Sequence, residues 1–120
     1  MSTESAPPKM SNREIALEFV RLFCAGESNA LAPLLAEDLQ FTGPFHRFGS
    51  REAYLTSLTS DPPEKCGYQV LSVTEDRNSV SMYYDYEKSE RTITIAQLCG
   101  FKDQKISEIL LVFDGRGFGS

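Results

Sequence analysis

Two side chains of the sequence are suited to acid–base catalysis, the imidazole of His46 and the carboxyl of Glu108. His46 is the only histidine and lies between two phenylalanines, and imidazole titrates close to neutral pH. Glu108 interrupts an apolar alternation, and burial would raise its pKa and make it a plausible general base. A single histidine in a short extended segment is more often a packing or surface residue than a catalytic one. His46 and Glu108 are therefore candidates for catalysis and not an established pair.

No part of the sequence has the spacing of a metal or cofactor site. Cys24, Cys66 and Cys99 are odd in number and widely separated, which favours the reduced thiols of a cytoplasmic protein. Cys99 is more often a small core residue than a nucleophile. No potential ligand is spaced to share a metal ion with His46. We therefore expect no metal and no cofactor.

A larger group of residues is suited to holding a small hydrophobic molecule. Tyr54, Tyr84 and Tyr86 could present hydroxyls inside an apolar pocket, or pack in the core with the hydroxyl at the surface. Gln97 lies on the apolar parity of a strand, where a buried amide needs a ligand, a water molecule or Tyr84 as its partner. The expected pocket residues are Phe19, Phe23, Tyr54, Met82, Tyr84, Tyr86, Ile95, Gln97 and Cys99.

These residues depend on a sheet that the second half of the chain predicts. Apolar and polar residues alternate over 79–87, 91–102 and 105–114, and 65–75 is rich in residues that favour strands. The segments between these strands are short and polar, so we expect neighbours to pair antiparallel.

The register of the two later hairpins decides which residues meet. Two-residue loops would place Tyr84 opposite Ile95 in one hairpin, and Cys99 opposite Glu108 in the other. Neither loop contains Asn-Gly or Asp-Gly, so a one-residue slip that turns Glu108 to solvent stays open. The expected pocket face carries Met82, Tyr84, Tyr86, Ile93, Ile95, Gln97, Cys99, Glu108, Leu110 and Val112.

The opposite face of the sheet is also partly apolar. It is expected to carry Tyr83, Thr92, Thr94, Ala96, Leu98, Ile109, Leu111 and Phe113. A sheet with apolar residues on both faces is covered on both faces, and the chain has too few helices to cover two. We therefore expect a homodimer through the outer face, with a monomer that exposes an apolar patch as the alternative.

The first half of the chain predicts three helices that cover the sheet. Ser11 and Glu14 form a capping box for the first, and Gly26 suits the left-handed position after it. A shorter second helix, capped by Ser28 or Asn29, is expected to run through Ala36, and a third begins after Ser50.

Length and charge indicate one domain without a nucleic-acid or membrane partner. We expect a domain over 11–114, with a disordered leader at 1–10, a tail at 115–120 and a short edge strand at 38–42. The net charge is −5 with no run of basic residues, which argues against nucleic acid and anionic membranes. No apolar run approaches a membrane span, and the leader lacks an apolar signal core.

Three segments and the order of elements point to a known group. The segments are LLAED at 34–38, FGSREAY at 48–54 and FKDQKI at 101–106. In these features the chain resembles the nuclear transport factor 2-like superfamily, which includes ketosteroid isomerases, polyketide cyclases of the SnoaL type and scytalone dehydratase. The resemblance implies an α+β fold, a cone-shaped barrel of a curved antiparallel sheet and helices around a pocket, often dimeric through the sheet.

The residues of ketosteroid isomerase chemistry are absent. That reaction uses a carboxylate base, a tyrosine and a protonated carboxylic acid, and these positions fall on Gly43, on Phe19, and on Gln97 or Leu98. The leading hypothesis is therefore a module that binds a small hydrophobic or aromatic molecule. The alternatives are an isomerase, cyclase or dehydratase with another acid–base group, and a dimeric interaction module without a ligand.

Overall fold

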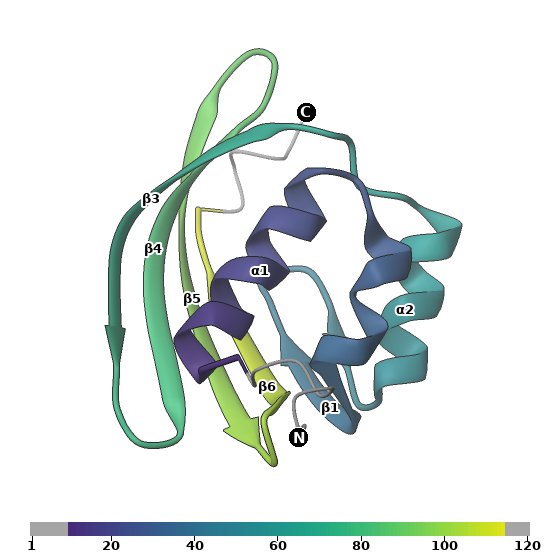
Figure 1. The fold of residues 1–120 in the computed structure, drawn as a ribbon. Coiled ribbons are helices and arrows are strands. Elements are labelled where there is room, and N and C mark those ends of the chain that lie inside the picture. Colours follow the sequence, from purple (N-terminus) through teal and green to yellow (C-terminus); the bar gives the residue numbers. More distant parts are fainter. Residues whose placement is uncertain (1–9, 115–120) are drawn as a thin grey trace, which may run out of the picture.

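The computed structural model describes residues 10–114 (Figure 1). Its helical elements are α1 (Asn12–Cys24), the 3₁₀ turns η1 (Ser28–Ala30) and η2 (Ala32–Leu34), and α2 (Arg51–Ser60). Its strands are β1 (Leu35–Thr42), β2 (Arg47–Phe48), β3 (Gly67–Glu75), β4 (Ser79–Glu87), β5 (Thr92–Lys102) and β6 (Lys105–Val112). The predicted leader, apart from Met10, and the predicted tail lie outside the described residues.

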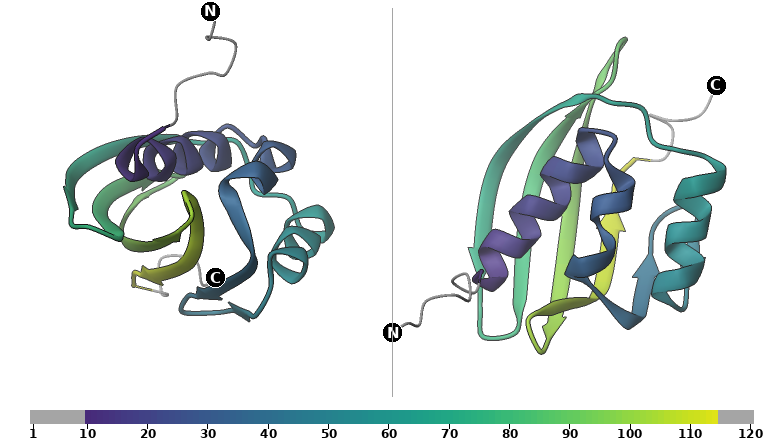
Figure 2. Two further views of the ribbon diagram at one scale, coloured as in Figure 1. Left: turned by 60° about the horizontal axis from the view of Figure 1, so that its bottom comes forward. Right: turned by 45° about the vertical axis from the view of Figure 1, so that its right-hand side comes forward.

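The six strands form one curved sheet in the order β2-β1-β6-β5-β4-β3. Both α-helices lie on its concave side (Figure 2), where α1 packs against β3, β4 and β6, and α2 packs against β1. The sheet does not close on itself, and the α+β class is confirmed. The sheet is mixed rather than purely antiparallel, because β1 pairs parallel with β6. None of the helices within residues 10–114 is long and apolar enough to span a membrane.

Both ends of α1 are formed as predicted. The Ser11 hydroxyl accepts a hydrogen bond from the Glu14 amide at 3.1 Å, and the Glu14 carboxylate accepts one from the Ser11 amide at 2.7 Å. These bonds satisfy two amides that have no partner within the helix. After the helix, Gly26 has φ +76°, the left-handed conformation in which a residue without Cβ is favoured.

We expect Gly26→Ala to lower the free energy of unfolding by about 1 kcal/mol. A Cβ at this position would find its nearest neighbour at 3.9 Å, so the cost comes from the positive φ rather than from a clash. Urea denaturation measures it. The matched control is Gly49→Ala, because that glycine has open space and no positive φ. Equal stability of the two variants would contradict the expectation.

The predicted second helix was wrong, whereas the predicted strand at 38–42 is present but starts earlier and is not at the edge of the sheet. In place of the helix the chain forms two 3₁₀ turns, with the Leu34 amide donating to the Leu31 carbonyl at 2.9 Å. Pro33 has no N–H for an α-helical bond, which favours these short turns. The strand then begins at Leu35, and it is not at the edge, because β2 pairs with it over its last two residues.

The register is as predicted for the hairpin of β4 and β5, and in the last hairpin it follows the alternative that the sequence left open, a slip by one residue. Tyr84 lies opposite Ile95 as predicted. In the last hairpin the two-residue loop forms, but an irregularity between residues 100 and 101 places Cys99 opposite Ile109 rather than Glu108. Residue 107 is the extra residue, so every later side chain of β6 lies on the face opposite to the predicted one.

The shift in β6 exchanges the two predicted sets of side chains. Ile109 is fully buried and Leu111 and Phe113 pack against the core, although all three were expected on the outer face. Leu110 and Val112 were expected on the pocket face, but their exposed fractions are 38% and 57%. The bulge therefore places three apolar side chains in the interior near the end of the sheet, where two others were predicted.

Candidate functional site

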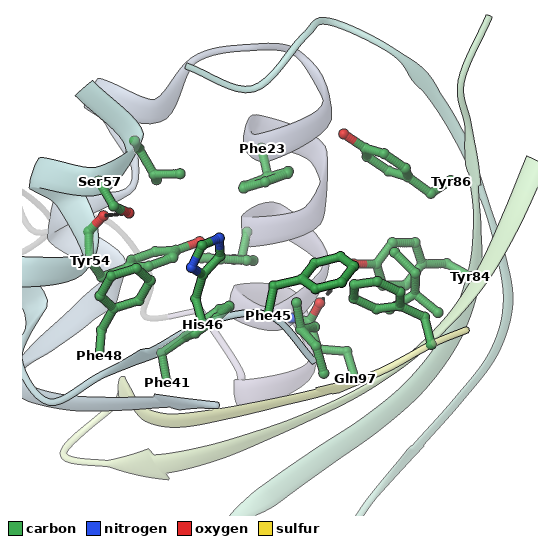
Figure 3. Close-up of a pocket in the computed structure, with 15 residues that line it drawn as sticks. Phe23, Phe41, Phe45, His46, Phe48, Tyr54, Ser57, Tyr84, Tyr86 and Gln97 are labelled. Carbon is green, nitrogen blue, oxygen red and sulfur yellow. Dashed lines mark hydrogen bonds between the residues drawn. The ribbon is translucent and has the colours of Figure 1, made fainter. Parts of the chain in front are cut away.

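A cavity of about 420 Å³ lies between the concave face of the sheet and the two helices (Figure 3). Nine of its fifteen lining residues are Phe or Tyr, and among the described residues no Asp, Glu, Lys or Arg lines it. The lining residues are Phe19, Phe23, Phe41, Phe45, His46, Phe48, Tyr54, Ser57, Leu58, Tyr84, Tyr86, Ile95, Gln97, Leu111 and Phe113. The volume falls in the usual range for small-molecule sites, roughly 300–1,000 Å³.

The structure places most of the predicted pocket residues on this cavity. Those that line it are Phe19, Phe23, Tyr54, Tyr84, Tyr86, Ile95 and Gln97. Met82 and Cys99 are instead fully buried in the core and do not border the cavity. The prediction missed Phe41, Phe45, Phe48, Ser57, Leu58, Leu111 and Phe113. The alternation of apolar and polar residues in the strand at 38–42 could have predicted that Phe41 faces the interior. Leu111 and Phe113 could not be predicted in this way, because the bulge in β6 reverses the faces of the residues after it.

The two catalytic candidates, His46 and Glu108, lie on different sides of the sheet. His46 is exposed at the cavity mouth, and its ring packs on that of Phe48 with the centroids 5.8 Å apart. The turn between β1 and β2 holds it there, because the Gly43 amide donates to the His46 carbonyl at 2.9 Å. Glu108 is exposed beside Gly100 on the outer face. The structure therefore does not bring the imidazole and this carboxylate together.

A buried polar pair lies at the side of the cavity formed by β4 and β5. The Tyr84 hydroxyl donates to Gln97 Oε1 at 2.8 Å (Figure 3), and Gln97 Nε2 donates to Cys99 Sγ at 3.3 Å. Gln97 is only 2% exposed. Its amide has two N–H groups and sulfur is a weak acceptor, so the amide keeps donor capacity for a molecule in the cavity.

Tyr54 provides a second polar group from the α2 side. Its ring is 3% exposed and stacks on Phe41, with the centroids 4.8 Å apart. The Ser57 hydroxyl donates to the Tyr54 carbonyl at 2.6 Å, but the described residues give the Tyr54 hydroxyl no hydrogen bond. Within the described residues, every side-chain oxygen or nitrogen that is fully enclosed has a hydrogen-bond partner. The Tyr54 hydroxyl has none, so it is not fully enclosed and borders the cavity (Figure 3).

Burial keeps the phenols of the cavity in the protonated form. It raises the pKa of Tyr54 and of Tyr84 well above the ordinary value of a phenol, and the nearby Cys99 adds to the effect at Tyr54. The pKa of Tyr86 is raised as well, first by burial and then by Cys66. At neutral pH the three phenols are therefore hydrogen-bond donors rather than bases. No group of three His, Cys, Asp or Glu within residues 10–114 could hold a metal ion.

The fold has close counterparts among solved structures. A protein from Cytophaga hutchinsonii, described as NTF2-like and of unknown function, matches with a TM-score of 0.81 and 23% sequence identity. The match covers 96% of this chain and 100% of that one. This chain has the nuclear transport factor 2-like fold. The predicted resemblance is thereby confirmed at the level of the fold.

Two further structures share the nuclear transport factor 2-like fold. An NTF2-like protein of unknown function from Burkholderia xenovorans matches with a TM-score of 0.75 at 18% identity, over 86% of this chain and 82% of that one. A protein from Catenulispora acidiphila with a ketosteroid isomerase-like fold, in complex with trimethylamine, matches with a TM-score of 0.69 at 15% identity, over 87% and 88%. No protein-family model and no curated protein matches the sequence.

Proposed function

We propose that the protein binds a small, uncharged, planar or aromatic molecule that carries a hydrogen-bond acceptor. The observation that supports this best is the composition of the cavity wall, which is mostly aromatic and contains no charged Asp, Glu, Lys or Arg among the described residues. Tyr54 and Gln97 add neutral donors from opposite sides of the cavity. Such a site stabilises an apolar ring and orients one oxygen on it.

The cavity chemistry favours binding over acid–base catalysis. A general base must reach its proton and titrate near the working pH, but the buried phenols of the cavity have raised pKa values. His46 is the remaining candidate, and it lies at the mouth without a carboxylate partner among the described residues. The relative from Catenulispora acidiphila is in complex with trimethylamine, which supports a binding role for a protein of this fold.

A fluorescence titration with a neutral naphthyl ketone tests the proposal. We expect saturable binding with a blue-shifted emission and a Kd on the order of 10–100 μM. An alkyl naphthalene of the same size, which lacks the carbonyl, is the matched ligand and should bind more weakly by about tenfold. Absence of saturable binding of both compounds up to their solubility limit would contradict the proposal.

Replacing Gln97 with Leu should separate the two parts of the site. We expect the affinity for the naphthyl ketone to fall about tenfold while the affinity for the alkyl naphthalene stays unchanged, because only the carbonyl uses the amide. The control is Thr94→Val, which removes an exposed hydroxyl from the same strand. Equal losses for both ligands would mean that Gln97 only supports the core.

We further propose that the chain forms a homodimer through the outer face of the sheet. This face exposes Tyr83, Leu110 and Val112, the first with an exposed fraction of 54%. Large exposed apolar side chains grouped on one face are typical of an interface. We expect light scattering to give twice the 13.4 kDa chain mass and Tyr83→Lys to give the monomer. A monomeric wild-type protein at about 50 μM would contradict this proposal.

A further inference from the structure

Two cysteines that are distant in sequence meet where α1 ends and β3 begins. Cys24 is the last residue of α1, and Cys66 immediately precedes β3. The Cys66 amide donates a hydrogen bond to the Cys24 carbonyl at 2.8 Å. The bond lengths along this path limit the separation of the two Cα atoms to about 7 Å at most. A disulfide requires about 4.4–6.8 Å between its Cα atoms, so this hydrogen bond brings the two residues close enough for a disulfide without a large backbone movement.

The side chains of the two cysteines interact as well. The Cys66 thiol lies near enough to the Cys24 thiol to affect its ionisation, and both thiols are free. Cys24 is 1% exposed, and its burial together with the neighbouring Cys66 raises its pKa to about 12. Cys66 is half-buried and lines a second cavity of about 500 Å³ beside the first. Only one thiol of the pair is therefore accessible from solvent.

We propose that Cys24 and Cys66 form a reversible disulfide when the accessible thiol, Cys66, reacts with a hydroperoxide. The two residues divide the roles that this chemistry requires. Cys66 meets the oxidant through the second cavity, and Cys24 lies next to it as the resolving thiol. Buried thiols with a raised pKa are poor first nucleophiles, which assigns the first step to Cys66.

The reaction proceeds in two balanced steps. The Cys66 thiolate attacks one hydroperoxide oxygen, so that an S–O bond forms, the O–O bond breaks, and the departing alkoxide or hydroxide takes up a proton. The Cys24 sulfur then attacks the resulting Cys66 sulfenic acid. An S–S bond forms, the S–O bond breaks, and the hydroxide leaves as water with the Cys24 proton. Two thiols lose two electrons in total, and the hydroperoxide gains them.

Cys99 provides an internal comparison in the same molecule. It is fully buried in the core, and it accepts a hydrogen bond from Gln97 Nε2. Neither Cys24 nor Cys66 is its partner within the described hydrogen bonds. An oxidant whose reaction with a thiol is limited by access should therefore leave Cys99 unmodified while Cys24 and Cys66 react.

Peptide mapping under non-reducing conditions tests the proposal on the full wild-type chain. After treatment with hydrogen peroxide we expect a peptide that links Cys24 to Cys66, a mass loss of about 2 Da, and recovery of both thiols with a dithiol reductant. In Cys24→Ser we expect a sulfenic acid on Cys66 that a 1,3-dione traps. In Cys99→Ser the disulfide should form as in the wild type.

Several results would overturn the assignment. These are a disulfide between two chains instead of within one, oxidation of Cys99 at the same rate as Cys66, and conversion of Cys66 to a sulfinic acid in the wild type without any cross-link. The peptide map of the oxidised wild-type chain is sufficient to support or overturn the proposal. The test therefore does not depend on whether the variants fold.

Discussion

Replacing Ile95 with Phe is expected to reduce the affinity for the naphthyl ketone about 100-fold while the protein stays folded. Ile95 is 5% exposed in the middle of β5, lies opposite Tyr84, and lines the cavity. The larger ring would occupy part of the cavity of about 420 Å³, and the ligand would lose the same volume. Aromatic side chains are compatible with a strand, so the substitution changes the cavity more than the sheet.

The control for this variant is Ile93→Phe. Ile93 lies on the same strand with a similar exposed fraction, 6%, but does not line the cavity. We expect its affinity for the ketone to stay within about threefold of the wild type. Circular dichroism checks that both variants are folded. If both variants bind like the wild type, the ligand does not occupy this cavity.

Stability should fall steeply above about pH 10 because the buried phenols resist ionisation. The pKa of Tyr54 and of Tyr84 is raised by burial in the folded protein. Below pH 10 these two phenols are protonated in both the folded and the unfolded state, and their full contribution to stability is present. Above it the unfolded chain loses protons that the folded chain retains, so stability decreases with rising pH. We expect a loss on the order of 2 kcal/mol between pH 9 and pH 11.

Urea denaturation at a series of pH values measures this loss. Burial also raises the pKa of Cys24 and of Cys99. These thiols add a further loss of stability with rising pH, which begins at a lower pH than that of the phenols because an ordinary thiol ionises at lower pH. The variant Tyr54→Phe isolates one phenol. It should decrease the slope by about 1.4 kcal/mol per pH unit above pH 10. A slope identical to that of the wild type would show that this phenol ionises in the folded protein as it does in water.

Local patterns were sufficient to predict most of the sheet. The register between β4 and β5 follows from alternation on both strands and a two-residue loop, so Tyr84 and Gln97 were placed on one face from the sequence. The bulge in β6 was not predictable in the same way. It adds one residue without a distinctive composition, although Gly100 allows the close approach, since a Cβ there would lie 3.3 Å from the Glu108 side chain.

The cavity wall on the β1 side depends on contacts between distant segments. Phe41, Phe48 and Tyr54 come together because β1 pairs with β2 and α2 packs on β1. Alternation within a short segment does not show which strand it joins. The parallel pairing of β1 with β6 is non-local, so the sequence pattern suggested an edge strand and missed this aromatic cluster.

The most direct test of the proposed binding is an NMR titration of methyl-labelled protein with the naphthyl ketone. We expect saturable shifts of the Leu58, Ile95 and Leu111 methyl groups, which line the cavity, and little change at Leu110 on the outer face. Shifts centred on Leu110, or no shifts at the solubility limit of the ketone, would contradict the proposal that the interior cavity is the binding site.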